Sequence, residues 1–316
     1  MSTSLSSLKE IQEKYFSGEA PVSPQILRRL QRDPRAGARK LYKALSRRFE
    51  DQARERKRLD AMLHFERVLW QAGIVHIAGV DEVGIGPLAG PVVAAAVVFP
   101  PNTEIDGIDD SKALDEETRC RLDATIRANA SGIGIGVLSV DEIDRINIYR
   151  AGIRAMQVAV SLLPVAPQHV LVDSRTIPDI SQPQNSFDKG DGINFSIAAA
   201  SIVAKVYRDN LMAQLDTQFP GYGFADHKGY ATPGHQDAIR RLGPCSIHRK
   251  SFDYIRELCG EYSDTFYTLK NDGAAIATRG DLKLWEGRVR EAREQLSPME
   301  HKKLLLMANR LWKRAE

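Results

Sequence analysis

Apolar residues recur along this chain with two different spacings. These separate a helical first part from a middle part that mixes strands and helices. Up to residue 70 the apolar positions have helical spacing. They are Leu41, Leu45, Phe49, Leu59, Leu63 and Val68. Ala72-Gly73 is a typical helix end, because glycine readily adopts the backbone conformation of a C-terminal cap. We therefore predict a helical N-terminal extension over residues 1–73.

From Ile74 onward, short apolar runs rich in Val, Ile and Ala predict strands. These runs are residues 76–80, 92–99, 133–138 and 169–172. Helical patterns lie between and after them, over 139–163, opened by a capping box of Ser139 and Glu142, and over 196–219. Strands and helices mixed in one core indicate an α/β layer architecture. This domain is predicted to cover residues 74–259.

The last part of the chain, residues 260–316, has a helical pattern of its own. It is predicted to start loosely through Asn271-Asp272-Gly273 and then to form two short helices. A capping box of Ser297 and Glu300 opens the second. Apolar and basic residues share this extension, so a small packing module and a nucleic-acid contact both remain open.

Composition narrows the class of protein. A hydrophobic fraction of 43% and a charged fraction of 27% are ordinary for a globular protein and exclude wholesale disorder. No apolar run reaches the roughly 18 residues of a membrane-spanning helix, and the first residues lack the pattern of a signal peptide, so we expect a cytoplasmic protein and no membrane partner. Cys120, Cys245 and Cys259 are too few and too far apart for a disulfide framework, and we expect reduced packing residues.

Positive charge is concentrated near the N-terminus, although the net charge of the chain is only +3. Between Arg28 and Arg58 there are thirteen Lys or Arg residues against four Asp or Glu. The stretch is predicted to be a basic helical arm. A solvated surface helix and a phosphate-contacting helix fit this pattern equally well.

Two adjacent carboxylates, Asp81 and Glu82, leave the end of a predicted buried strand and run into a glycine-rich turn. An ionised carboxylate at the end of an apolar strand needs a strong partner, and a divalent cation is the strongest available. A solvated turn would be the ordinary interpretation of one such pair. Two more acids at element ends, Asp173 and Asp191, count against the solvated-turn interpretation.

These four acids are predicted to form one cluster. Neighbouring strands that end on the same side would bring Asp81 and Asp173 together, and Asp191 can approach from the start of the following helix. Oxygen ligands without paired cysteines favour Mg²⁺ or Mn²⁺ over zinc. Two such ions suit phosphodiester hydrolysis, because one activates a water molecule and the other stabilises the leaving oxygen.

The segments that carry these acids resemble those of the ribonuclease HII family, in the same order over about residues 74–257. The matching runs are 79–91, 110–112, 172–173, 189–191, 196–209, 220–224, 227–230 and 247–252. The resemblance implies a ribonuclease H-like fold, with a mixed sheet flanked by helices. It also implies that Asp81, Glu82, Asp173 and Asp191 are the metal-binding catalytic acids.

The same resemblance implies a function. The family cuts RNA hybridised to DNA, including single ribonucleotides within duplex DNA, and leaves 3′-hydroxyl and 5′-phosphate ends. Lys112 matches a phosphate contact, and Tyr230 matches a tyrosine that stacks on the deoxyribose beyond the cleavage site. We expect a monomer with an RNA–DNA hybrid as its partner.

One position departs from the family pattern. The Gly-Arg-Gly turn that contacts the 2′-hydroxyl at an RNA–DNA junction is Gly84-Ile85-Gly86 in this chain. The glycines still let backbone donors approach a sugar, but Ile85 cannot pair with phosphate. Type III relatives also lack this arginine and prefer continuous hybrids, so we expect weak cutting at single ribonucleotides.

Other functions fit less of the sequence. A protein that binds hybrids without cutting them would be free to lose the four acids, and all are present. A structural nucleoid-type protein would leave the acids unexplained. His227, His235 and His248 have no zinc-site spacing, and we expect them at the surface or on phosphate.

Overall fold

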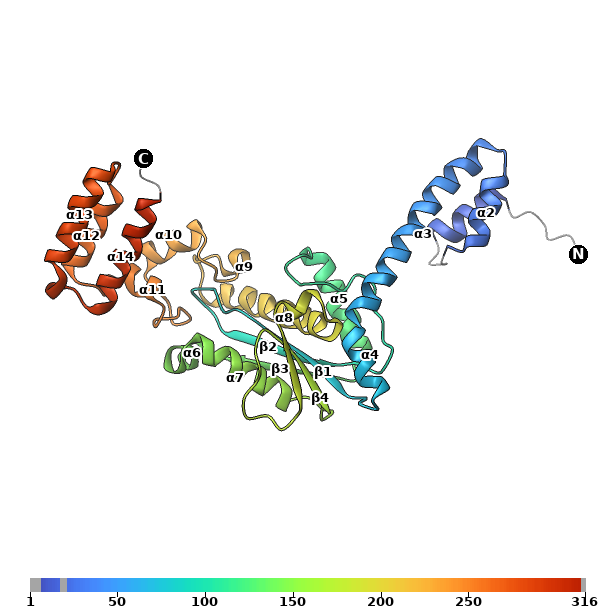
Figure 1. Cartoon of the computed structure of the whole chain (residues 1–316), viewed down its shortest axis with the longest axis horizontal. Helices are drawn as coiled ribbons and strands as arrows, with labels where there is room; N and C mark the ends of the chain where they lie inside the picture. Colours follow the sequence, from blue (N-terminus) through green and yellow to red (C-terminus); the bar gives the residue numbers. More distant parts are fainter. Residues whose placement is uncertain (1–6, 18–21, 314–316) are drawn as a thin grey trace, which may run out of the picture. The chain divides into compact units, whose positions relative to one another are not determined.

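A computed structural model describes residues 7–17 and 22–313 of the 316-residue chain (Figure 1). The chain divides into two compact units. The first takes in the N-terminal part up to Val83 together with residues 93–137 and 153–206, and the second takes in 84–92, 138–152 and 207–316. No described helix has the length and apolar character that crossing a membrane requires.

A five-stranded sheet forms the centre of the first unit, with strands in the order β3-β2-β1-β4-β5. The strands are β1 (Ile77–Val83), β2 (Val92–Val98), β3 (Gly132–Leu138), β4 (His169–Asp173) and β5 (Gln184–Phe187). β1 runs antiparallel to β2 and parallel to β4, and β4 runs parallel to β5. The sheet is therefore mixed, as predicted.

Helices cover both faces of this sheet (Figure 1). On one face lie α5 (Glu116–Asn129) and α8 (Phe195–Gln218), whose apolar residues form one buried cluster with those of β2. A run of alanines lets α8 approach closely: a Cβ added at Gly79 of β1 would lie 2.0 Å from the carbonyl carbon of Ser196. α7 (Ile148–Ser161) lies against β3, where added Cβ atoms at Gly134 and Gly136 would meet its carbonyl oxygens at 2.0 Å.

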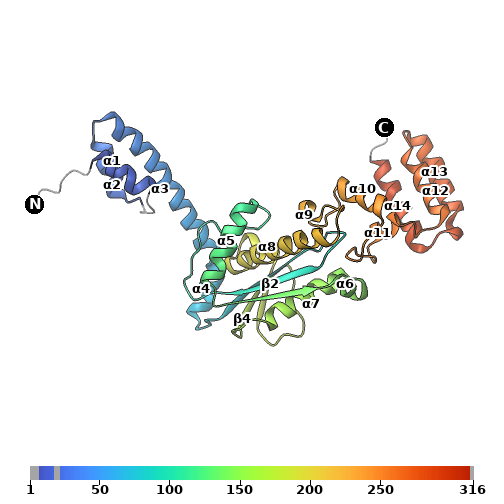
Figure 2. The same ribbon diagram turned by 180° about the vertical axis from the view of Figure 1, so that it is seen from behind.

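The N-terminal extension is helical, as predicted. It comprises α1 (Leu8–Gln12), the π-helical turn η1 (Glu13–Ser17), α2 (Pro24–Arg32), α3 (Ala36–Met62) and α4 (His64–Gln71). Figure 2 shows α1 and α2 beside the first half of α3, and buried residues of these three helices form a small core. Leu59, Met62 and Leu63 join the core of the sheet instead, so the end of α3 packs on the α/β part.

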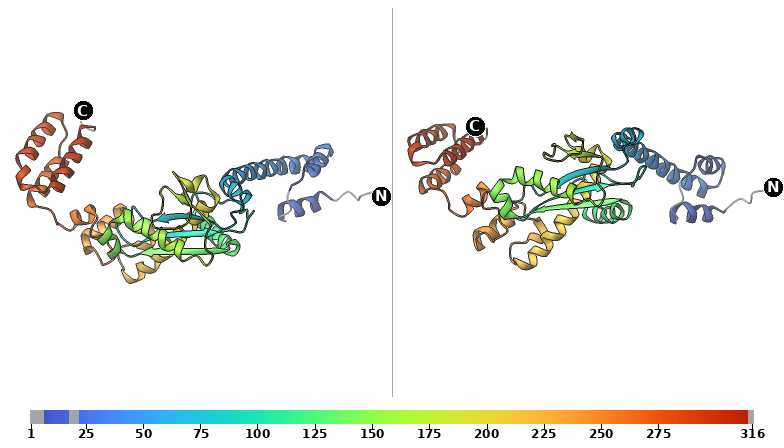
Figure 3. Two further views of the ribbon diagram at one scale, coloured as in Figure 1. Left: turned by 60° about the horizontal axis from the view of Figure 1, so that its bottom comes forward. Right: turned by 90° about the horizontal axis from the view of Figure 1, so that it is seen from below.

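The second unit is mainly helical. It contains α6 (Val140–Ile146), α9 (Phe224–His227), α10 (Pro233–Leu242) and α11 (Asp253–Leu258), and after Gly260 come α12 (Asp264–Ala274), α13 (Arg279–Glu291) and α14 (Pro298–Trp312). The short 3-10 turn η3 (Arg293–Gln295) precedes α14. The last three helices lie side by side around their own core, which includes Phe266, Trp285 and Leu304 (Figure 3). Glu257 of α11 bonds Lys270 and Lys303, which attaches this bundle to α11.

Several predicted details need correction. The tail has three helices rather than two, and Asn271-Asp272-Gly273 lies inside α12 instead of forming a loose start. The predicted helix over 139–163 breaks at Asn147, which has a φ of 69°. The capping boxes at Ser139 and Ser297 are present as predicted. The cysteines form no disulfide among the described residues, but Cys120 and Cys259 are exposed and do not act as packing residues.

Candidate metal centre

Three of the predicted acids come together at one edge of the sheet. Asp81 and Glu82 belong to the end of β1, and Asp173 ends the neighbouring parallel strand β4. Val80 and Val172 are the last pair between these two strands, so the next residues, Asp81 and Asp173, lie side by side where the pairing of β1 with β4 ends. One carboxylate oxygen from each of the three acids lies within 4.8 Å of the others.

The fourth acid, Asp191, lies in the one-turn helix η2 (Gly190–Gly192) just before α8. Its carboxylate accepts a hydrogen bond from the Nζ of Lys112 at 3.2 Å. The preceding N–H, of Gly190, donates to Asp173 at 2.6 Å, which holds η2 against the end of β4. Asp191 is therefore next to the three-acid group, with Lys112 as its present partner.

Burial and like charges act on this cluster. Burial raises the pKa of Asp81 well above its ordinary value, and the charges of Glu82, Asp173 and Asp191 raise it further. Burial likewise raises the pKa of Glu82, with Asp173 adding to the effect. Burial also raises the pKa of Asp191, although Lys112 opposes the shift. Such a group of acids is costly unless positive charge joins it.

The donor set fits a divalent cation. All available ligands are carboxylate oxygens, which hard cations such as Mg²⁺ and Mn²⁺ prefer. One of them, Oε2 of Glu82, is buried and has no hydrogen-bond partner among the described residues. A buried carboxylate oxygen without a partner is destabilising, and a cation at this point would give it one. These residues thus suit the predicted metal site.

The glycine-rich turn that follows β1 belongs to the second unit and is held by two buried arginines that the sequence analysis did not single out. Arg249 donates to the carbonyl oxygens of Gly84 at 2.6 Å and Ile85 at 3.1 Å, and to three more carbonyls up to Pro91. Arg208 donates to the carbonyl oxygens of Pro91, Ala89 and Lys228. Both arginines lie inside runs that resemble the ribonuclease HII family, and this is the sequence signal that could have identified them.

Both arginine side chains are fully buried, and the hydrogen bonds just described all go to backbone carbonyl oxygens. Burial lowers the pKa of Arg249 to about 9, and the charge of Arg208 adds to the shift. Gly84 has a φ of 95°, and a Cβ there would lie 2.4 Å from the Nε of Arg208. The two guanidinium groups therefore hold the turn through its carbonyl oxygens, and they leave no room for a side chain at Gly84.

Tyr230, which the resemblance matches to a sugar-stacking tyrosine, is 41% exposed. The nearest heavy atom to a Cβ added at Gly86 would be Cε1 of Tyr230, at 3.8 Å. The Nδ1 of His235 donates to the backbone oxygen of Tyr230 at 2.9 Å, and the Nε2 of His248 donates to the Nε2 of His235 at 3.1 Å. These contacts hold the backbone of Tyr230.

The expectation that the histidines lie at the surface or on phosphate was wrong for His235 and His248. His235 and His248 are completely buried, and His227 stacks on His235 with ring centroids 4.3 Å apart. Burial lowers the pKa of His235 to about 4, and burial together with the charge of His235 lowers that of His248 to about 4. Both rings are therefore neutral hydrogen-bonding groups at pH 7.

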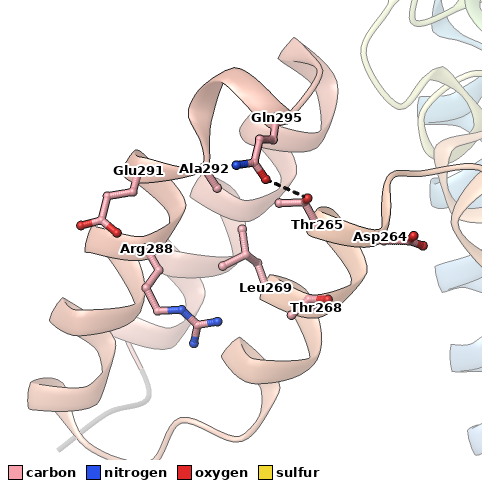
Figure 4. Close-up of a pocket in the computed structure, with 8 residues that line it drawn as sticks. All are labelled: Asp264, Thr265, Thr268, Leu269, Arg288, Glu291, Ala292 and Gln295. Atoms are coloured by element: carbon pink, nitrogen blue, oxygen red, sulfur yellow. Dashed lines mark hydrogen bonds between the residues drawn. The ribbon is translucent and has the colours of Figure 1, made fainter.

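A cleft of about 440 Å³ lies elsewhere, among α12, α13 and η3 (Figure 4). Thr265 and Gln295 bond across it at 3.2 Å, and Arg288 is paired with Asp272. Among the described residues, the metal-ligating groups gather at Asp81, Glu82 and Asp173 and not in this cleft. We assign the cleft no chemistry.

Comparisons with known proteins place these features in one family. The family profile described as Ribonuclease HII matches residues 78–255, and the profile of the Ribonuclease HII N-terminal domain matches residues 7–70. Ribonuclease HII of Myxococcus xanthus (strain DK1622) is 49% identical over 254 residues, covering 80% of this chain and 87% of that protein. Ribonuclease HII of Geobacillus thermodenitrificans (strain NG80-2) is 46% identical over 248 residues, covering 78% and 94%.

A solved structure agrees at the level of the fold. The ribonuclease H2 from Pyrococcus horikoshii OT3 superposes with a TM-score of 0.51 at 24% identity, covering 59% of this chain and 98% of that one.

Proposed function

The chain belongs to the ribonuclease HII family and is an endoribonuclease, and from this premise we propose that Asp81, Glu82, Asp173 and Asp191 bind its divalent cations and form its catalytic site. The observation that carries the proposal is the meeting of three carboxylates within 4.8 Å at the ends of two adjacent strands. The buried, unpartnered oxygen of Glu82 supports it. The substrate is the RNA strand of an RNA–DNA hybrid.

Divalent cations at these acids, Mn²⁺ or Mg²⁺, would supply the charge that activates a water molecule and stabilises the departing oxygen. Hydrolysis breaks the bond between phosphorus and the 3′ oxygen, so the products carry a 3′-hydroxyl and a 5′-phosphate. The chain's own groups keep the acids in place. Asp173 accepts hydrogen bonds from the N–H of Gly190 and the hydroxyl of Ser174. Lys112 is 76% exposed in its side chain and can also approach a phosphate.

We also propose that the turn Gly84-Ile85-Gly86 and Tyr230 contact the substrate. The carbonyl oxygens of Gly84 and Ile85 already accept from Arg249, and in this proposal the N–H groups of the turn contact the ligand. Such donors can bond a 2′-hydroxyl, the group that distinguishes RNA from DNA. Ile85 adds no charge, so continuous RNA is expected to be the better substrate.

The basic arm provides a second surface for nucleic acid. Arg39, Lys43 and Arg47 of α3, which we call the α3 stripe, are exposed and stand at helical spacing on the side opposite the buried Leu45. None of the three forms an ion pair with another described residue. The N-terminal residues up to 73 are in this proposal an extension that adds phosphate contacts, residues 74–259 are the catalytic domain, and residues 260–316 are a helical C-terminal extension.

The assay that tests this function uses purified protein with a uniform RNA–DNA hybrid and with an RNA–RNA duplex of the same sequence. We expect the hybrid's RNA strand to be cut in Mn²⁺ or Mg²⁺, with 5′-phosphate ends, and to remain intact in EDTA. Tight binding of the hybrid without any cutting in either metal would favour the alternative, a non-cleaving hybrid-binding protein. Because all four acids come from one chain, we propose that the enzyme acts as a monomer, and light scattering tests the oligomeric state. We also propose that the enzyme is cytoplasmic.

A further inference from the structure

A buried carboxylate in the N-terminal extension has no place in the chemistry described so far. Glu66 of α4 is only 1% exposed, although it is an acidic residue. Its Oε1 accepts the backbone N–H of Ser196 at 2.9 Å, and its Oε2 accepts the side-chain amide of Asn194 at 3.4 Å. Glu66 therefore caps the start of α8, more than a hundred residues away in sequence.

The residues that Glu66 holds are themselves tied to the metal centre. Asn194 is completely buried, and its backbone N–H donates to the oxygen of Gly190 at 2.8 Å. Its side-chain oxygen accepts from the N–H of Ile197 at 3.2 Å. Asn194 thus bonds backward to η2 and forward to α8, with Glu66 as its third partner.

From Gly190 the connection to the acids is direct. The N–H of Gly190 donates to Asp173, and the next residue in the chain is Asp191. On the other side, the start of α8 leaves no space beside β1, since an added Cβ at Gly79 would clash with the backbone of Ser196. Residues 190–196 are therefore held at three points: at Asp173, at β1 and at Glu66.

We propose that Glu66 is a positioning residue for the metal centre, which fixes the segment 190–196 and so sets the places of Asp191 and of the N–H that orients Asp173. This inference rests on the proposed metal site. In this role the N-terminal extension completes the catalytic domain as well as adding charge to it. Partners of this kind commonly change metal affinity by roughly 10–100-fold when they are lost.

The chain offers a matched control. Glu300 of α14 is also a buried carboxylate, 4% exposed, that accepts two backbone N–H groups, from Ser263 at 2.6 Å and from Ser297 at 2.6 Å. It belongs to the C-terminal bundle, outside the residues matched by the catalytic-domain profile. Glu300→Ala should reduce stability in a similar way without changing the binding of metal.

The experiment measures Mn²⁺ binding directly, by titration calorimetry of the full chain without substrate. We expect Glu66→Ala to weaken Mn²⁺ binding by about tenfold or more, and Glu300→Ala to leave it unchanged. Glu66→Gln keeps the acceptor for Ser196 and the side-chain volume, so it should recover most of the affinity. At saturating Mn²⁺ the KM for a hybrid should stay near that of the wild type, because the substrate contacts are intact.

Equal Mn²⁺ affinity in folded Glu66→Ala and wild type would overturn the inference, and so would an equal loss in Glu300→Ala, since the effect would then be general destabilisation. If Glu66→Ala does not fold, Glu66→Asp takes its place, because its shorter side chain cannot reach Ser196 and an unchanged affinity would again contradict the role. An Asp173→Asn variant separates the two proposals. If Asp173→Asn keeps full affinity, the metal site itself is wrong; if it loses affinity and the Glu66 variants do not, only the role of Glu66 is wrong.

Discussion

Replacing Asp81 by Asn should have opposite effects on stability and activity. Asp81 is buried among three other acids, and burial and their charges raise its pKa. At a separation of up to 4.8 Å, two like charges repel by about 3.5 kcal/mol or more at an effective dielectric constant of roughly 20. Proton uptake relieves part of this cost. We therefore expect Asp81→Asn to raise the free energy of unfolding by about 1–3 kcal/mol in EDTA.

In divalent metal, the wild type should become more stable to unfolding than Asp81→Asn. A cation at 100 times its Kd stabilises the wild type by about 2.7 kcal/mol, whereas the variant has lost a ligand and should gain much less. The Oδ1 of Asp81 accepts the N–H of Glu82 at 2.7 Å, and the amide oxygen of Asn can keep this bond. Loss of local structure is therefore not an expected cause of inactivity.

The assay is thermal unfolding of wild type and Asp81→Asn, each in EDTA and in Mn²⁺, with hybrid hydrolysis measured on the same samples. A shift of about 2–4 °C for each kcal/mol is readily measured for a domain of this size. The reasoning would be refuted if the variant melted below the wild type in EDTA, or if Mn²⁺ raised both melting temperatures equally.

Three further predictions concern specificity, the arm and pH. Ile85→Arg should favour single ribonucleotides, because a charged contact contributes about 1.5–3 kcal/mol. We expect the ratio of kcat/KM on a single-ribonucleotide duplex to kcat/KM on a continuous hybrid to rise by roughly one to two decades. An unchanged ratio at fixed salt would show that the glycine backbone suffices. Changing all three residues of the α3 stripe to Gln should make hybrid binding less dependent on salt, whereas Arg35→Gln and Arg288→Gln, which remove arginines already paired with aspartates, should not. The pKa values of His235 and His248 fall from 6.5 to about 4 on folding, so the unfolded chain takes up protons first as pH decreases. The contribution of these imidazoles to the free energy of unfolding should be constant above about pH 6.5 and fall between about 6.5 and 4, by at most about 3.4 kcal/mol each, in the opposite direction to proton uptake by the acid cluster. Urea titrations of the wild type and His248→Gln would contradict the assignment if the difference between their free energies of unfolding stayed the same across this range.

The main elements could be predicted because their patterns are local. The apolar runs of β1 and β4 end at Asp81 and Asp173, and parallel neighbours end at one edge, so the meeting of these acids followed from the sequence. β5 was missed because its four residues, from Gln184 to Phe187, are mostly polar and lie at the edge of the sheet. Backbone hydrogen bonds hold such an edge strand, and they leave no pattern in its side chains.

What the sequence could not provide were contacts between distant residues. His235 and His248 were expected at the surface, because a histidine in a loop usually faces water, but they bond each other in the interior. Arg249 appears in the sequence as one more basic residue, and only the fold shows that five carbonyl oxygens surround it. The cap that Glu66 forms on α8 spans 130 residues and has no local pattern at all.

The most direct measurement is single-turnover cleavage of a uniform RNA–DNA hybrid in Mn²⁺ by the wild type, Asp173→Asn and Asp123→Asn. Asp123 is a buried acid on α5 that pairs with Arg127 and lies outside the cluster, so its variant removes the same charge without touching the proposed site. We expect cleavage by the wild type and by Asp123→Asn at similar rates, and none above background by Asp173→Asn. Undiminished cleavage by Asp173→Asn would contradict the central claim that this acid cluster is the catalytic metal centre.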